Sequence, residues 1–244
     1  MTSLFHSRGL PAAVVAIGFA VIARTLGSVT DGGALMGVLV AFILMAAAGL
    51  AGFLPLLTVF VITVLATRWG YGRKQQLGVA ERGPGRTASQ VLANLGATAL
   101  CALPTLWFPR LSGTLLIGAM AALAEAAADT ASSEIGQTSA HAAYMITSFR
   151  EAPIGADGAI SVIGTLAGCL AACLVAWVSA VFDVVSWNWT PLIALSGIAG
   201  MLLDSILGAT WETSGKMGND AVNFVSTVFA ADLALTVIWL YRIL

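Results

Sequence analysis

The chain alternates between long apolar runs and short polar segments along almost its whole length. The runs are continuous and rich in Ala, Leu and Gly, without the alternating pattern of barrel strands. Most are close to the roughly 20 residues that a helix needs to cross a bilayer. The pattern predicts eight helices, the second and third of which could be one broken helix, at about residues 10–26, 34–49, 53–68, 88–107, 112–131, 159–182, 191–210 and 221–241.

Composition agrees with this pattern. Hydrophobic residues make up 59% of the 244 residues and charged residues only 9%, which is too few charges to cover the surface of a soluble domain. We therefore expect an all-α polytopic membrane protein that forms a single integral-membrane domain over residues 1–244. DGGALMGVLVAF at residue 31 resembles DGAISVIGTLAG at residue 157, so two four-helix halves are possible, although chance similarity is about equally probable. The net charge of -1 says nothing about nucleic-acid binding, but no basic tail or aromatic-interleaved basic patch is present, so we expect no nucleic-acid partner.

Charge predicts how the helices are oriented. In the eight-helix arrangement, segments 27–33, 69–87, 132–158 and 211–220 share one face, and eight of the eleven basic residues lie near it. The positive-inside rule places this face in the cytoplasm, with both termini outside, as in a cell (inner) membrane protein. The long polar, Gly-rich segments also lie on this face. A one-sided enzyme that takes a soluble substrate from the cytoplasm would have this pattern.

Four carboxylates, Glu125, Asp129, Glu134 and Asp204, lie within or beside the apolar runs. A charged group facing hydrocarbon is costly, so such residues usually face the protein interior and often bind a cation or a proton. Glu125 and Asp129 are four residues apart and share a helix face. Magnesium is bound by one or two carboxylates and by substrate phosphates, which suits this spacing. Buried ion pairs with Arg24, Arg68 or Arg150 are the structural alternative.

Two segments could bind phosphate. The loop 67–90 combines five basic residues with five glycines, a composition that suits triphosphate oxygens but also anionic lipid headgroups. No P-loop motif is present. The segment from Arg150 to Thr165 begins a helix with several glycines, and it is either an anion site or a flexible turn. Asn94 and Asn223 lie near the inner ends of their helices and could bind ligand or join helices.

Five motifs identify a family resemblance: TRWGYGRKQQLGVAERGPGRTASQVLAN, EAAADTASSEIG, ITSFREAPIGADGAISVIGTLAG, GMLLDSILGATWE and NDAVNFVS. In this order they resemble an integral-membrane family, formerly a domain of unknown function, that includes animal transmembrane protein 19 and the phytyl-phosphate kinases of plants and cyanobacteria. The resemblance covers about residues 31–244. It implies phosphoryl transfer from a nucleoside triphosphate, with CTP favoured over ATP, to an isoprenoid monophosphate such as phytyl or geranylgeranyl phosphate.

The same resemblance implies roles for individual residues. Mg²⁺ would be the cofactor, with Asp129, Glu134 and Asp204 as ligands, and Gly136 lies in the same motif. The implied catalytic residues are Lys74, Arg86, Asp129, Arg150 and Asp204. The implied substrate-binding and nucleotide-binding residues are Glu81, Asn94, Ser133, Gly155, Gly158, Ser161, Ser205, Glu212 and Asn223.

Two other functions remain open at this stage. The buried carboxylates could serve a transporter coupled to protons or cations. A cytidylyltransferase would form a CDP-lipid and release pyrophosphate, whereas a kinase would release CDP. Identification of the leaving group separates these two enzymes.

Overall fold

The structure, a computed structural model, describes residues 2–80, 83, 85–139 and 141–243, with side chains from residue 9 onward. Its helices are α1 (Thr2–Thr25), α2 (Asp31–Ala48), α3 (Leu50–Arg68), α4 (Tyr71–Leu77), α5 (Ala88–Ala102), α6 (Ser112–Ser139), α7 (Val162–Val181), α8 (Thr190–Leu207) and α9 (Asn219–Ile243). Within this part of the chain, seven helices are long and apolar enough to cross a membrane: α2, α3, α5 with the turn that follows it, α6, α7, α8 with its flanking turns, and α9. The described part of α1 that qualifies as apolar, Gly9–Thr25, is shorter. The prediction of a helical, multi-pass membrane protein is confirmed.

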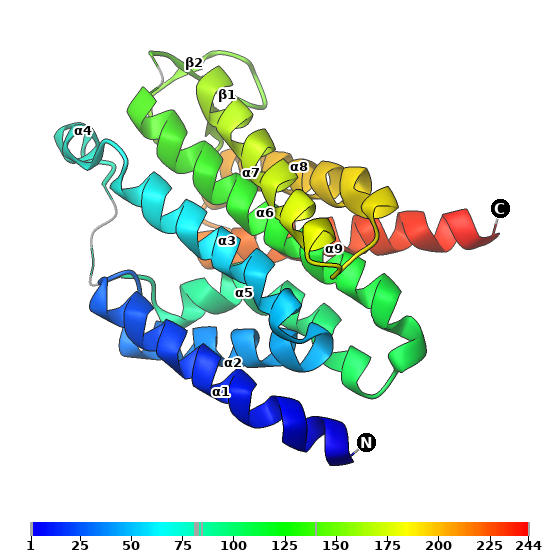
Figure 1. The fold of residues 1–244 in the computed structure, drawn as a ribbon. Helices are drawn as coiled ribbons and strands as arrows, with labels where there is room; N and C mark the ends of the chain where they lie inside the picture. Colours follow the sequence, from blue (N-terminus) through cyan, green and yellow to red (C-terminus); the bar gives the residue numbers. More distant parts are fainter. Residues whose placement is uncertain (1, 81–82, 84, 140, 244) are drawn as a thin grey trace.

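The helices run alternately in opposite directions (Figure 1). Both termini lie at one end of the bundle, and α4 and the strands lie at the other. This alternation is the one that the apolar pattern predicts. It places the connections α1–α2, α3–α5, α6–α7 and α8–α9 at the same end, which we call the loop end.

Helix α6 is the centre of the bundle. It contacts α3, α5, α7, α8 and α9. In its most apolar stretch 72% of the residues are buried, against 33–44% in the other spanning helices. Its sequence explains this position, because the run from Gly118 to Ala131 consists largely of Ala, and small side chains let neighbouring helices approach closely. Gly168 of α7 is an example: a Cβ there would lie 2.8 Å from the Ala128 carbonyl oxygen of α6. Because α6 joins both proposed halves, they form one helical body.

Three helix ends differ from the sequence prediction by five residues or more, and the first is the start of α1 at Thr2, eight residues before its predicted start. Helix α5 ends at Ala102 and a 3₁₀ turn follows over Leu103–Leu106, because Pro104 has no N–H with which to continue an α-helix. Helix α6 continues to Ser139, eight residues beyond its predicted end, so Glu134 lies on the same helix as Asp129. Because Thr130, Ser132 and Ser133 are polar, hydropathy alone does not predict this last part of the helix.

Three short strands were not predicted. β1 (Ala143–Met145) pairs antiparallel with β2 (Glu151–Ala152) and with β3 (Ala159–Ile160), in the order β2-β1-β3. Strands of two or three residues in a Gly-containing segment give no periodic signal. This small sheet folds residues 141–161 over the loop end of α6 and α7 (Figure 1).

Candidate active site at the loop end of the bundle

A polar cavity of about 390 Å³ lies at the loop end. Its walls come from the ends of α5, α6, α8 and α9, from the start of α7, and from residues 154–161. We call it the acidic cavity, because five of its lining residues within the described part of the chain are carboxylates: Asp129, Glu134, Asp157, Asp204 and Glu212. Among the described residues, Arg86 is the only Lys or Arg on the same lining.

The loop that carries Asp157 is held in place by close backbone contacts. Gly158 has φ +75°, and a Cβ there would lie 2.3 Å from the Ala209 backbone nitrogen, so only glycine fits without a shift of the backbone. The loop therefore lies directly on the π-helical turn Gly208–Glu212 that ends α8. Single π-helical turns inside α-helices are frequent at functional sites. The contact brings Asp157 close to Asp204 and Glu212.

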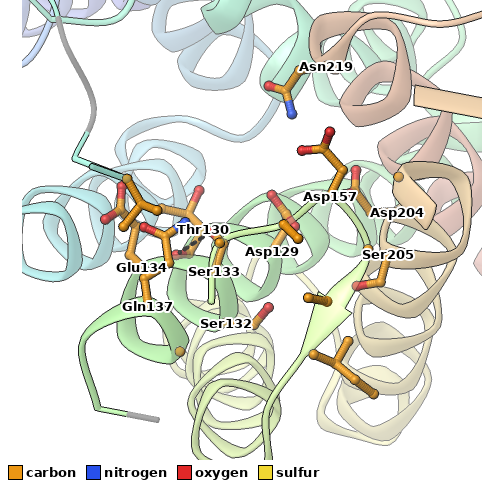
Figure 2. Close-up of a pocket in the computed structure, with 18 of the residues that line it drawn as sticks. Asp129, Thr130, Ser132, Ser133, Glu134, Gln137, Asp157, Asp204, Ser205 and Asn219 are labelled. Carbon is orange, nitrogen blue, oxygen red and sulfur yellow. Dashed lines mark hydrogen bonds between the residues drawn. The ribbon is translucent and has the colours of Figure 1, made fainter. Parts of the chain in front are cut away.

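Three carboxylates from three different segments point toward the same space. Figure 2 shows Asp129 of α6, Asp157 of the loop and Asp204 of α8 directed toward one another, with Asn219 across from them. None of these three carboxylates forms an ion pair within the described residues. Asp204 accepts a hydrogen bond from the Ser226 hydroxyl of α9 at 3.1 Å, which orients its carboxylate. Like charges that converge without a paired cation favour the binding of a cation.

Glu134, by contrast, already has a partner. Its carboxylate forms an ion pair with the ammonium of Lys74 of α4 and accepts a hydrogen bond from the Thr67 hydroxyl at 3.2 Å. The Lys74 ammonium also donates to the carbonyl oxygens of Ala66 and Thr67, at 2.9 and 3.0 Å, which uses all three of its donors. Lys74 is 1% exposed and does not line the cavity. Its observed contacts join α4 to α3 and α6 and fix the position of Glu134.

Arg86 is anchored by its backbone and leaves most of its guanidinium for a ligand. Its N–H donates to the Ser28 carbonyl oxygen, and its own carbonyl oxygen accepts from the N–H of Thr30, both at 3.0 Å. Within the part of the chain that the structure describes, its guanidinium donates one hydrogen bond, to the Thr130 hydroxyl of α6 at 3.2 Å. A guanidinium has five N–H donors, so several remain for phosphate oxygens.

Helix N-termini supply further donors for an anion. Helices α5, α7 and α9 all begin at the cavity, where Gln90, Thr165 and Asn219 line it. The N-terminus of an α-helix carries a partial positive charge and unpaired amide N–H groups. Thr87 caps α5 and Ser161 caps α7 through hydroxyls that accept from Gln90 N and Gly164 N. The cavity therefore combines carboxylates for a cation with positive helix ends for an anion.

Most of the residues that the sequence predicts for the site line this cavity: Arg86, Asn94, Asp129, Ser133, Glu134, Gly136, Gly155, Gly158, Ser161, Asp204, Ser205, Glu212 and Asn223. Two do not. Lys74 is buried behind Glu134, and Arg150 is exposed at the turn between β1 and β2, off the cavity lining. Glu81 lies outside the described residues. The sequence prediction omitted Asp157, Gln90, Ser132 and Asn219, all of which line the cavity.

The residues present fit a magnesium ion that is shared with a phosphate ligand. Within the described residues, no group of three or more His, Cys, Asp or Glu side chains forms a ready-made metal site. Magnesium often needs only one or two carboxylates and takes its other ligands from water and substrate phosphates. Asp129 and Asp204 could supply these carboxylates. That Glu134 is a third ligand stays a prediction, because Lys74 and Thr67 already contact both of its oxygens.

The chain matches the family model described as integral membrane protein DUF92 over residues 14–231. It belongs to this family. The match starts inside α1, earlier than residue 31, from which the resemblance was expected. No solved structure matches it significantly.

Three relatives of the DUF92 chain illustrate the range of the family. It is 34% identical over 200 residues to the uncharacterized membrane protein MJ0933 of Methanocaldococcus jannaschii, covering 81% of this chain and 79% of that protein. It is 31% identical over 196 residues to the uncharacterized membrane protein sll0875 of Synechocystis, covering 79% and 76%. It is 30% identical over 194 residues to the chloroplastic protein VTE6 of Arabidopsis thaliana, covering 77% of this chain and 58% of VTE6.

Proposed function

We propose that this protein is a membrane-bound phosphotransferase that converts an isoprenoid monophosphate to the diphosphate with a nucleoside triphosphate, CTP being favoured. The observation that carries the proposal is the acidic cavity, where unpaired carboxylates, Arg86 and three helix N-termini meet at one end of a membrane-spanning bundle. Two further observations, from outside the cavity, support the proposal: the resemblance of the sequence motifs to those of the phytyl-phosphate kinases, and the similarity of the chain to VTE6.

The charge balance of the cavity suits a nucleotide that arrives with magnesium. A triphosphate alone would be repelled by the five carboxylates on the lining. Mg²⁺ held by Asp129 and Asp204 would neutralise charge on the phosphate oxygens. The guanidinium of Arg86 and the N-termini of α5, α7 and α9 would bind the remaining phosphate oxygens.

Phosphoryl transfer here needs little acid–base chemistry from the protein. An oxygen of the isoprenoid monophosphate forms the new bond to the γ-phosphorus of the triphosphate, and the bond from that phosphorus to the β-phosphate oxygen breaks, so that the nucleoside diphosphate leaves. The attacking group is already an anion at neutral pH. The protein must mainly position two phosphates and stabilise the charge on the transferred group. We assign the second task to Arg86, whose anchored backbone holds its guanidinium at the cavity wall.

The acidic cavity should face the cytoplasm, because most of the basic residues gather at the loop end. This places the nucleotide site where CTP and ATP are available. Cysteine variants at the exposed residues Ser214 and Ser186, on opposite ends of the bundle, test the orientation in intact cells. An impermeant thiol reagent should label Ser186→Cys and leave Ser214→Cys unlabelled, and the reverse result would contradict the proposed orientation.

The experiment that tests the proposal uses purified protein, Mg²⁺, a prenyl phosphate and CTP labelled at either the α- or the γ-phosphate. Geranylgeranyl and phytyl phosphate are the acceptors, and ATP is the second nucleotide. We expect the γ-label in the prenyl diphosphate and the α-label in released CDP. Transfer of the α-label to lipid, with release of pyrophosphate, would identify a cytidylyltransferase. If no lipid product forms with any of these pairs, the phosphotransferase proposal is wrong.

A further inference from the structure

A second cavity lies beside the acidic cavity and has the opposite character. It has a volume of about 80 Å³ and is lined by α1, α2, α3, α5 and α6 and by the segments that precede α2 and α5. Apolar residues and glycine make up most of its wall, and Arg86 is its only charged residue in the described part of the chain. We call it the apolar cavity. Neither the family match nor the relatives assign it a ligand.

Arg86 and Asn94 line both cavities. Arg86 reaches across from the start of α5 to hydrogen-bond Thr130 of α6, and Asn94 follows two turns further along α5, where it is 7% exposed. The two side chains therefore form a polar boundary between an acidic space and an apolar space. A molecule that occupied both sides would need an apolar body and an anionic head at this boundary.

Aromatic rings close the apolar cavity toward the middle of the bundle. Phe19 of α1 contacts Phe60 of α3 edge to face, with ring centroids 4.8 Å apart, and Phe53 at 5.1 Å. Phe19 and Phe60 line the cavity, and Phe53 lies beyond them on α3, toward the end that carries the termini. The cavity is therefore short. At about 10–15 Å³ for each water-sized group, it has room for roughly five to eight carbon-sized groups, which is one isoprene unit.

Helix α2 forms a flat wall of this cavity through two glycines. A Cβ at Gly33 would lie 2.2 Å from the Arg86 carbonyl oxygen, so this glycine is required for the contact that anchors Arg86. Gly37, one turn further along α2, also lines the cavity, and a Cβ there would meet no atom within 4 Å. Open space at Gly37 leaves room for a branched ligand, and a larger side chain at this position would occupy it.

We propose that the apolar cavity binds the first isoprene unit of an isoprenoid monophosphate, with its phosphate at Arg86 and Asn94 facing the acidic cavity. The rest of the ligand's prenyl chain extends into lipid. The inference rests on the proposed function, because it supplies the acceptor of that reaction. The prenyl chain has apolar surroundings both in lipid and in the cavity, so its transfer from lipid into the cavity adds little hydrophobic free energy to binding. The cavity instead selects by shape and positions the phosphate beside the nucleotide.

The test compares two glycines, Gly37 and Gly18, at which an added Cβ would meet no atom within 4 Å. Gly37→Leu fills the apolar cavity, and Gly18→Leu on the exposed side of α1 is the matched control. The isoprene unit and a leucine side chain together would overfill the apolar cavity, and overfilling costs about 1–3 kcal/mol. Gly37→Leu should therefore raise the KM for geranylgeranyl phosphate about tenfold or more, with the KM for CTP unchanged. Gly18→Leu should behave as the natural protein. If both variants keep the natural KM, the acceptor lies elsewhere.

A binding experiment without nucleotide separates this inference from the proposed function. A geranyl phosphate that carries a diazirine on its first isoprene unit should crosslink to α2 or α3 beside the apolar cavity, and Gly37→Leu should remove that crosslink. Crosslinking at this position without any diphosphate product would support the site and overturn the kinase. Diphosphate formation with crosslinks confined to α7, α8 and α9, which do not line the apolar cavity, would support the kinase and overturn the site. Competition by dioleoyl phosphatidic acid as strong as by phytyl phosphate would overturn the assignment of an isoprenoid ligand.

Discussion

The two cavities differ in almost every property except one shared wall. The acidic cavity is about five times larger, is lined by carboxylates and helix N-termini, and lies where polar loops meet the bundle. The apolar cavity is small and lies between helices. Arg86 and Asn94 belong to both. The loop end therefore has adjacent spaces that suit a hydrated, charged ligand and a lipid chain. A reaction between a nucleotide and a prenyl phosphate requires this arrangement.

The largest expected effect is on the acidic side of this comparison. Asp129→Asn keeps the shape of the side chain but removes the charge that we assign to magnesium. Loss of several kcal/mol of charge stabilisation should lower kcat on the order of 10³-fold to 10⁴-fold while the protein stays folded. The exposed Asp183→Asn, at the end opposite the acidic cavity, is the matched control and should leave kcat unchanged. A near-natural rate in Asp129→Asn would remove Asp129 from the metal site.

Arg86→Gln tests the boundary that the two cavities share. Removal of one preorganised cationic group from a phosphoryl-transfer site should lower kcat/KM about 10²-fold to 10³-fold for both the nucleotide and the prenyl phosphate. Arg110→Gln, at an exposed position between α5 and α6, removes a charge at the other end and serves as the control. If Arg86→Gln changed the kinetics of only one substrate, Arg86 would serve one cavity and not both.

The Lys74–Glu134 pair should matter for stability. Lys74→Met leaves Glu134 without its cation in a mostly buried position, and breaking such a pair costs about 3–5 kcal/mol of unfolding free energy. Arg24→Met breaks an exposed pair with Asp31 and should cost less than about 1 kcal/mol. Thermal unfolding in detergent measures both variants. The double variant Lys74→Met/Glu134→Gln should recover much of the lost stability, and no recovery would show that Lys74 acts through other contacts.

The smallest effect concerns packing. A Cβ at Gly200 of α8 would lie 2.5 Å from the Glu125 Cγ and 2.9 Å from the Ser226 carbonyl oxygen, so Gly200→Ala should destabilise the protein by about 1–3 kcal/mol. Gly37→Ala in the apolar cavity should be neutral or stabilise it by up to about 1 kcal/mol, since alanine favours helix and space is available. Equal unfolding temperatures for the two variants would contradict the difference in packing.

The alternation of the long helices and most of the residues that line the acidic cavity could be predicted from the sequence, for physical reasons. Long apolar runs can only be satisfied as spanning helices, and carboxylates such as Asp129 and Asp204 are costly in such runs, which makes them candidates for a functional site. Asp157 could not be found in this way, because it lies in a polar loop where an acidic residue costs nothing. Its role depends on the contact of Gly158 with Ala209, a tertiary contact between residues about fifty positions apart.

Basic residues were the least predictable part of the site. Lys74, Arg86 and Arg150 all lie in polar segments at the loop end, and composition does not distinguish them. Their positions in the structure distinguish them. Lys74 is buried and all three of its N–H donors are used, Arg150 is exposed at the turn between β1 and β2, and Arg86 lines both cavities. The apolar cavity was also invisible in the sequence, because the residues on its wall are those that any packed helix would contain.

The central claim is that one bundle end brings a metal-bound nucleotide and a prenyl phosphate together across Arg86. Electron density for the protein with Mn²⁺, a non-hydrolysable CTP analogue and geranylgeranyl phosphate tests it most directly. We predict an anomalous peak beside Asp129 and Asp204, triphosphate density at the start of α5, α7 and α9, and the first isoprene unit beside Gly37. Metal density away from Asp129 and Asp204, or two phosphates on opposite ends of the bundle, would contradict the account.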